Sequence, residues 1–140
     1  MPGNLYYLED RRIHYITGYD YVELAVLPIY PGPWLVVAKG TVREVNARCK
    51  VEFSLGVHAM FSGLMGFDET STVVESEHSF MLTVAAKIPS EGGGGSFSIP
   101  PHRAVLIVRK DSSFPAAEAR VTNIKITAYP LDEIVATVLT

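Results

Sequence analysis

Apolar and polar residues alternate along most of this chain, and the period of two predicts β-strands. The clearest run extends from Ala47 to Val57. Its apolar positions are Cys49, Val51, Phe53, Leu55 and Val57, and the intervening positions are Arg48, Lys50, Glu52 and Ser54. One side of this strand is therefore expected in the core and the other in water.

Shorter runs rich in β-branched and aromatic residues predict further strands. They are Tyr21–Leu27, Trp34–Val42, Thr70–Val74, His78–Ile88, Ser96–Ile99 and Ala104–Lys110. A last run ends at Pro130, and its alternation predicts two faces. Thr122, Ile124, Ile126 and Ala128 are expected on one face, and Val121, Asn123, Lys125 and Thr127 on the other.

Proline, glycine and short polar residues separate these runs and predict the turns. The breaks fall at Pro28–Pro33, Val45-Asn46, a loop from about His58 to Asp68, the glycines Gly92–Gly95, Pro100-Pro101, and Asp111–Pro115. About eight strands with turns at this spacing, and no alternation of strand with amphipathic helix, predict an all-β fold. We expect a jelly-roll-like antiparallel β-sandwich.

The same pattern predicts one domain over residues 21–130, preceded by an N-terminal arm or first strand over 1–20. A tail over 131–140 follows, and its β-branched residues after Asp132-Glu133 leave helix and strand both open. Of the 140 residues, 48% are hydrophobic and 19% charged, so the chain can form a core without metal or disulfide. The low charge content also suggests apolar surface meant for a partner.

A net charge of −3 gives no basic face for nucleic acid. The longest apolar stretches, such as Trp34–Ala38, are too short to cross a bilayer, and the N-terminus does not resemble a signal peptide. We therefore expect neither a nucleic-acid nor a membrane partner, and synthesis in a cytoplasm. The single cysteine, Cys49, is expected as a buried structural thiol.

Candidate catalytic chemistry is sparse. The four histidines, His14, His58, His78 and His102, lack the close spacing of zinc-type sites, and no nucleophile elbow surrounds Ser62 or Ser96. A cupin-like metal site would require histidines to converge on Asp68 or Glu77 through space. We expect no enzyme, no cofactor and no metal.

Two features point to binding. The segment from His58 to Phe67 carries Met60, Phe61, Leu64, Met65 and Phe67 where a loop would be polar. It either plugs one end of the sandwich or contacts a partner. Six of the seven tyrosines lie in the first thirty residues, and the candidates for an interface or for stacking on sugar are Tyr6, Tyr7, Tyr15, Tyr19, Tyr30 and Trp34.

The turn before Trp34–Val42, the Cys/Val-rich strand and the closing run Arg120–Ala128 together resemble the compact jelly rolls of the tumour-necrosis-factor and complement-collagen-head superfamily. The resemblance extends from about Tyr21 to Tyr129 as a pattern of strands and turns, and it carries over no functional residue. It implies assembly, usually as trimers through one sheet face. The chain has no collagen stalk, signal peptide or disulfide, which favours a bacterial or viral module.

The sequence therefore predicts a non-enzymatic, oligomeric structural module, a trimer, that attaches to a larger assembly such as a phage capsid or tail. Such a role would place it in a virion. The alternative is a carbohydrate-binding module that uses exposed tyrosines and Trp34.

Overall fold

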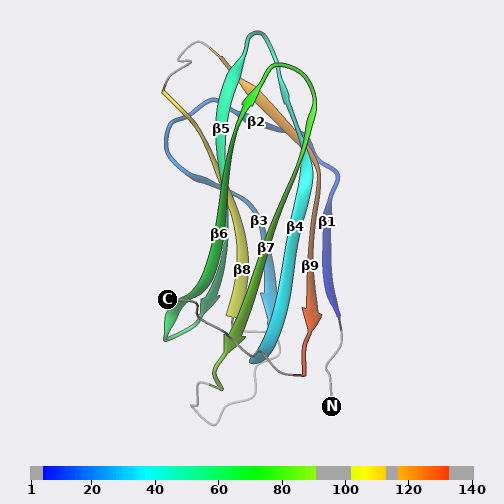
Figure 1. Ribbon diagram of the computed structural model, residues 1–140, viewed down its shortest axis with the longest axis vertical. Helices are drawn as coiled ribbons and strands as arrows, with labels where there is room; N and C mark the ends of the chain where they lie inside the picture. Colours follow the sequence, from blue (N-terminus) through cyan, green and yellow to red (C-terminus); the bar gives the residue numbers. More distant parts are fainter. Residues whose placement is uncertain (1–4, 91–101, 113–116, 133–140) are drawn as a thin grey trace, which may run out of the picture.

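The protein is an all-β sandwich, seen here in a computed structural model that describes residues 5–90, 102–112 and 117–132. Nine strands are present in these ranges, and the long ones run along the long axis of the molecule (Figure 1). Their bounds are β1 Tyr6–Asp10, β2 His14–Ile16, β3 Val22–Ile29, β4 Gly32–Glu44, β5 Cys49–Ala59, β6 Gly63–Val74, β7 His78–Ile88, β8 His102–Lys110 and β9 Ala119–Pro130. The described residues include no helix able to cross a membrane.

The strands form two antiparallel sheets. Sheet A has the order β1-β9-β4-β7, and the short β2 also pairs with β9. Sheet B has the order β3-β8-β5-β6. Chain neighbours such as β3 and β4 lie in different sheets, so the chain crosses repeatedly between the layers, and the predicted jelly-roll-like sandwich is confirmed.

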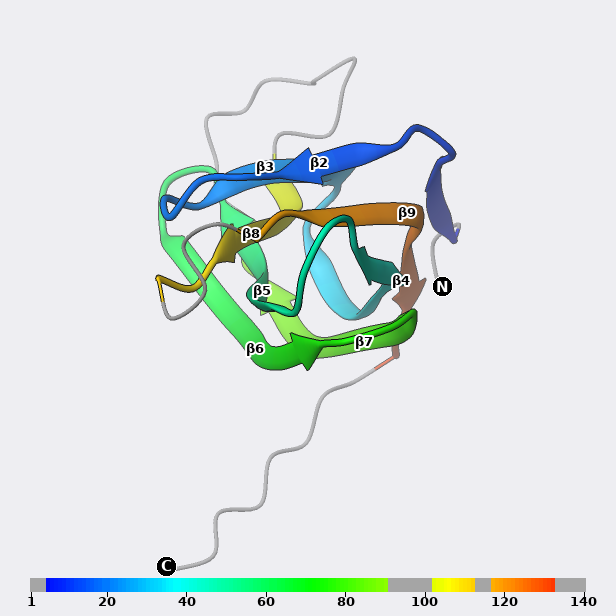
Figure 2. The ribbon, with the colours of Figure 1, turned by 90° about the horizontal axis from the view of Figure 1, so that it is seen from above.

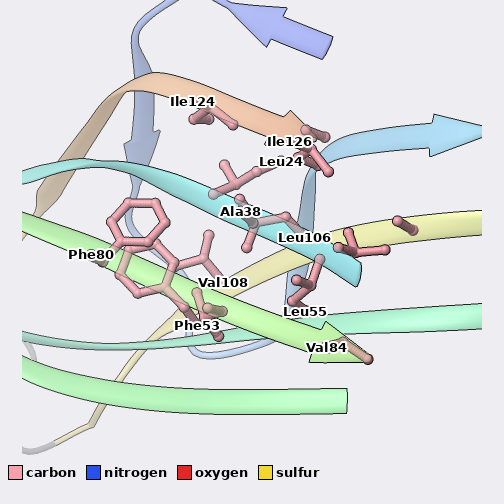
Figure 3. Close-up of a cluster of buried hydrophobic side chains, with 14 of the residues drawn as sticks. Leu24, Ala38, Phe53, Leu55, Phe80, Val84, Leu106, Val108, Ile124 and Ile126 are labelled. Carbon is pink, nitrogen blue, oxygen red and sulfur yellow. The ribbon is translucent and has the colours of Figure 1, made fainter. Parts of the chain in front are cut away.

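The core lies between the sheets and consists almost entirely of apolar side chains. Phe53 of β5 and Phe80 of β7 stack across it with ring centroids 4.0 Å apart (Figure 3). Gly40 lies opposite Phe80 in the register of β4 and β7. A Cβ at position 40 would come within 2.8 Å of the Phe80 ring, so the stacked pair requires glycine there.

The predicted alternation from Ala47 to Val57 is confirmed in β5. Cys49, Val51, Phe53, Leu55 and Val57 are all fully buried between the sheets. Burial raises the pKa of the Cys49 thiol, as expected for a structural cysteine. The bounds predicted for β7 also agree with the structure, because Pro89 follows the last paired residue, Ile88.

The loop predicted from about His58 to Asp68 is wrong. Only Met60, Phe61 and Ser62 form a turn, and β6 begins at Gly63, whose φ of 81° is allowed for glycine. The residues from Gly63 onward lie instead in a strand at the edge of sheet B. In both views β6 lies beside β7 of sheet A, which closes one side of the sandwich (Figures 1 and 2).

The two faces predicted for the last run are also only partly right. Thr122 and Asn123 interrupt the alternation, because β9 contains an extra residue opposite Gly40, between the pairs Lys39–Lys125 and Thr41–Thr122. Asn123 takes up this bulge with a φ of 55°. Val121 is therefore buried on the same side as Ile124, and Thr122 faces outward.

The first twenty residues are part of the sandwich as far as the structure describes them. β1 and β2 both pair with β9, and Gly18 accepts a backbone hydrogen bond from Lys110. The predicted strand Ser96–Ile99, the glycine run Gly92–Gly95 and nearly all of the tail 131–140 lie outside the described residues.

Candidate binding surfaces

The outer face of sheet A carries two adjacent rows of uncharged residues. Because side chains alternate along a strand, the residues paired across β1, β9, β4 and β7 share one face. The first row is Tyr7, Thr127, Val37 and Thr83, and the second is Tyr129, Leu35 and Ala85. Tyr7 is 50% exposed, and Val37 and Leu35 are half-buried by their neighbours.

Charged side chains begin in the next row of the same face. There Glu9 pairs with Lys125, which in turn pairs with Lys39. An uncharged centre beside a charged rim is the usual composition of a protein interface. None of the outward residues of β4, β7 and β9 was singled out by the sequence, because their role depends on strand order.

The tyrosine-rich N-terminus divides between this face and the interior. Tyr7 and Tyr15 point outward from sheet A and are exposed. Tyr6 points the other way, and its ring contacts those of Trp34, at 5.5 Å between centroids, and Tyr30, at 5.9 Å. Burial raises the pKa of Tyr6.

Trp34 cannot serve as an exposed stacking platform, and this corrects its assignment as a candidate. Its side chain is only 4% exposed, and its Nε1–H donates a 2.8 Å hydrogen bond to the carbonyl oxygen of Tyr30. Position 34 is near the start of β4, where its inward orientation places the indole in the core. The predicted sugar-binding site therefore cannot use the Trp34 indole, the largest ring among its candidates.

Tyr19 and Tyr21 lie in the segment before β3 rather than in a strand. Their rings contact cations of β8: the Lys110 Nζ lies 5.0 Å from the Tyr19 centroid and the Arg109 guanidinium 4.6 Å from the Tyr21 centroid. Arg109 also pairs with Glu52 of β5. These cation–π contacts stabilise the packing of the segment before β3 on the end of β8.

The Met/Phe segment separates into three environments. Met60 and Phe61 form the tip of the β5–β6 turn, and Phe61 is 71% exposed. The tip is fixed from behind, because the backbone N–H of Met60 donates a 2.9 Å hydrogen bond to Nδ1 of the buried His102. Met65 packs against the core, whereas Leu64 and Phe67 lie exposed on β6.

A small hollow lies on the outer face of sheet B beside Leu64 and Phe67. Its volume is about 220 Å³. Strands β5, β6 and β8 supply the remaining lining residues, which are Ser54, Gly56, His58, Glu69, Val105 and Ile107. The sequence analysis did not identify this hollow, and the signal that could have indicated it is the glycine at position 56 inside the alternating run of β5.

The strongest charged cluster is built on β1 and β2. Asp10 is buried and accepts hydrogen bonds from the Arg12 backbone at 2.9 Å and from the Arg12 guanidinium at 3.0 and 2.9 Å. Its Oδ2 also lies 2.9 Å from Nε2 of His14. The hydrogen bonds from Arg12 have the largest effect, and together with the His14 contact they hold the pKa of the Asp10 carboxyl well below its usual range. Such a fully engaged carboxylate is unsuited to accept a proton from a substrate.

Among the described residues, no group of three or more histidine, cysteine, aspartate or glutamate side chains is arranged to hold a metal ion. The convergence required for a cupin-like site therefore does not occur in that part of the chain. His58 faces outward from sheet B, and His102 lies behind the β5–β6 turn.

The fold is an all-β sandwich of the jelly-roll kind. No protein-family model matches the sequence, and no curated protein matches it. Among solved structures, Eiger TNF from S. frugiperda is similar over 100% of this chain and 99% of that chain, with a TM-score of 0.60 and 8% identity. At that identity the similarity shows the fold, and the resemblance to jelly rolls of the tumour-necrosis-factor type is confirmed at that level.

Two further solved structures match with lower TM-scores. A pilus protein of Bacillus endospore appendages has a TM-score of 0.43 and 10% identity, and covers 94% of this chain and 95% of its own. A family 11 carbohydrate-binding module from Clostridium thermocellum has a TM-score of 0.37 and 11% identity, with 88% coverage of both chains.

Proposed function

We propose that this protein is a non-enzymatic structural module that forms a homotrimer through the outer face of sheet A and attaches to a larger assembly, such as a phage capsid or tail. The observation that carries this proposal is the pair of uncharged rows on that face, of which the first crosses β1, β9, β4 and β7 and the second crosses β9, β4 and β7. Strands about 4.8 Å apart and like-facing residues about 6.8 Å apart give the seven residues of these rows an area of roughly 230 Å².

The chemistry of the rows supports contact with a second copy. Tyr7 and Tyr129 bring broad rings with polar tips, and Leu35 and Val37 bring half-buried apolar surface. Apposed copies would remove these groups from water without desolvating a charge at the centre. The charged row of Glu9, Lys125 and Lys39 would then lie at the rim.

The exposed β5–β6 tip is the element that we assign to attachment. Met60 and Phe61 form the tip of the turn between β5 and β6 of sheet B, and the bond to His102 holds the turn in place. An exposed aromatic residue on a fixed turn is a suitable anchor for a pocket on another protein.

The test is the native mass of the full chain, measured by light scattering after size exclusion at two concentrations about tenfold apart, so that mass action would be visible. We expect three times the 15.3 kDa of one chain at both. A Thr83→Lys variant places a charge in the first uncharged row and should lower the mass to that of one chain. The matched control, Ser71→Lys, adds the same charge to an exposed strand position of sheet B and should leave the mass unchanged.

A wild-type chain that is monomeric at both concentrations would refute the proposal. So would a Thr83→Lys variant that keeps the wild-type mass, because a lysine at the β7 end of a buried row carries a large desolvation cost.

A further inference from the structure

The hollow on sheet B exists because one row of side chains is interrupted. Register places Val26, Val105, Gly56 and Phe67 side by side across β3, β8, β5 and β6, all facing outward. Gly56 has no side chain, and the side chains of His58 and Leu64 border the space where its Cβ would lie. Val105 is only 5% exposed although it lies outside the core cluster, which shows how deeply this part of the face is recessed.

The backbone does not require glycine at position 56. Its φ is not positive, unlike those of Gly32 and Gly63. The constraint comes from the neighbours, because a Cβ would lie 2.8 Å from Nε2 of His58 and 3.2 Å from Cδ1 of Leu64. Glycine inside a central strand costs stability, and it commonly marks a place where a ligand approaches the backbone.

The walls of the hollow combine one exposed aromatic ring with three polar groups. Phe67 is 59% exposed at the rim, and Leu64, Val105 and Ile107 complete the apolar lining. The polar groups are the Ser54 hydroxyl, the His58 imidazole and the Glu69 carboxylate. Burial and the nearby Arg103 lower the pKa of His58, partly opposed by Glu23, so the ring is neutral at pH 7 and offers one donor and one acceptor.

These groups select the chemistry of a ligand. A purely apolar ligand would leave Ser54 and His58 without hydrogen bonds, which costs free energy in a recessed site. An anion would be repelled by Glu69. A ring with several hydroxyls can donate to the carboxylate, exchange hydrogen bonds with serine and histidine, and place its C–H face on Phe67.

The size of the hollow limits the ligand to one ring. Pockets for drug-sized molecules begin at about 300 Å³, whereas this volume is about 220 Å³. We propose that the hollow at Gly56 binds a single neutral sugar ring, stacked on Phe67 and hydrogen-bonded by Ser54, His58 and Glu69. This site is distinct from the tyrosines and Trp34, and it lies on the sheet opposite the proposed trimer face.

The experiment uses the ¹⁵N-labelled full chain titrated with the methyl glycosides of glucose, galactose, mannose, xylose, arabinose and N-acetylglucosamine. Concentrations reach about 50 mM, because a one-ring site is expected to bind in the millimolar range. At least one glycoside should give saturable shifts in the amide signals of Ser54, Gly56, His58, Val105 and Ile107, and leave Val37 and Thr127 unmoved.

Phe67→Ala should weaken that affinity at least about threefold, because it removes the stacking ring. Phe61→Ala is the matched control, since it removes the same side chain from an exposed position outside the hollow, and it should leave the affinity unchanged. Glu69→Gln keeps the shape of the hollow and should also weaken binding, because a neutral amide is a poorer acceptor than a carboxylate.

The proposal is overturned if no glycoside shifts the five amides, if the shifts fall on sheet A, or if Phe61→Ala weakens binding as much as Phe67→Ala. It is also overturned if cyclohexanol binds as well as the sugars, because the hydroxyls would then contribute nothing. Native mass measured on the same samples keeps this result separate from the trimer, since Phe67→Ala should leave the mass unchanged.

Discussion

At the scale of single residues, the stacked core pair gives the most direct test of the packing. Gly40→Ala would place a methyl group 2.8 Å from the Phe80 ring and 3.2 Å from the Thr122 carbonyl oxygen. We expect it to lower the free energy of unfolding by about 1–3 kcal/mol, because the stacked ring pair and a backbone oxygen cannot both give way.

The matched control for Gly40→Ala is Gly18→Ala, where no atom lies within 4 Å of the added methyl group. Urea denaturation of both variants should show a loss at position 40 and a change close to zero at position 18. Equal losses at the two positions would mean that glycine matters for the backbone rather than for the Phe80 contact.

Asp10 provides a second prediction, which depends on pH. Asp10→Ala leaves Arg12 and His14 without their shared acceptor and should cost about 1–3 kcal/mol at pH 7. The pKa of Asp10 is lowered in the folded state. Its contribution is therefore complete above the unfolded pKa of about 3.9 and is lost as the pH falls below that value.

Thermal denaturation of wild type and Asp10→Ala between pH 7 and pH 2 should therefore show two curves that converge in acid. Glu9→Ala is the control, because Glu9 pairs with the highly exposed Arg11 and such a pair contributes little. A difference between wild type and Asp10→Ala that persists unchanged at pH 2 would contradict this account.

Predictions for single residues were correct where the local alternation of apolar and polar residues decides whether a side chain is buried. The burial of Cys49 followed from the alternation around it. The position of Trp34 did not, because an aromatic residue after a turn fits either a rim or a core. Tyr6 and Tyr7 are adjacent, yet one joins the Trp34 cluster and the other faces outward, and only the pairing of β1 with β9 decides which.

At the scale of elements, the bulge in β9 decides which side chains of that strand face the core and which face outward. Asn123 occupies the left-handed region, which asparagine tolerates better than other non-glycine residues. Asn123→Val should lower the free energy of unfolding by about 1–2 kcal/mol, because a β-branched side chain is disfavoured there. Asn123→Gly should be close to neutral, and urea denaturation of the pair measures the difference.

An Asn123→Val variant as stable as Asn123→Gly would show that β9 can move its extra residue elsewhere. That shift would alter the register of the outward residues, since a slip of one position exchanges the faces of a strand. The amide signals of Lys125 and Thr127 would then change as well.

The bounds of β7 were predictable from the sequence, and the start of β6 was not. The bounds of β7 were visible because its alternation runs unbroken to Pro89. The start of β6 was hidden, because its glycines and exposed apolar residues are typical of a loop. Gly63 has the positive φ that follows the turn. Gly66 lies where a Cβ would meet Val84 of β7 at 2.9 Å, so each glycine has a structural reason to be there.

At the scale of the whole molecule, the two outer faces have different characters. Sheet A has an uncharged centre that suits contact with a copy of the chain, whereas sheet B has a small polar hollow set in apolar walls. The face that we propose to bury in a trimer leaves the other free. Sandwiched sheets lie about 10 Å apart, so substitutions on the two outer faces should act independently.

The sequence predicted the architecture but not these surfaces. Periodicity identifies the side of a strand that is buried, and turns limit the number of strands. The surfaces depend on which strands become neighbours: Leu35 meets Tyr129 and Ala85 only because β4 lies between β9 and β7. That information is carried by contacts far apart along the chain.

The position of Cys49 has a practical consequence for studying how the molecule opens. The thiol is the only one in the chain, is fully buried at the start of β5, and has its pKa raised by burial, so a thiol reagent finds almost no reactive thiolate while the sandwich is closed. Each labelling event therefore records a transient separation of the two layers. The labelling rate therefore measures how often the sandwich opens, and no probe has to be introduced into the chain.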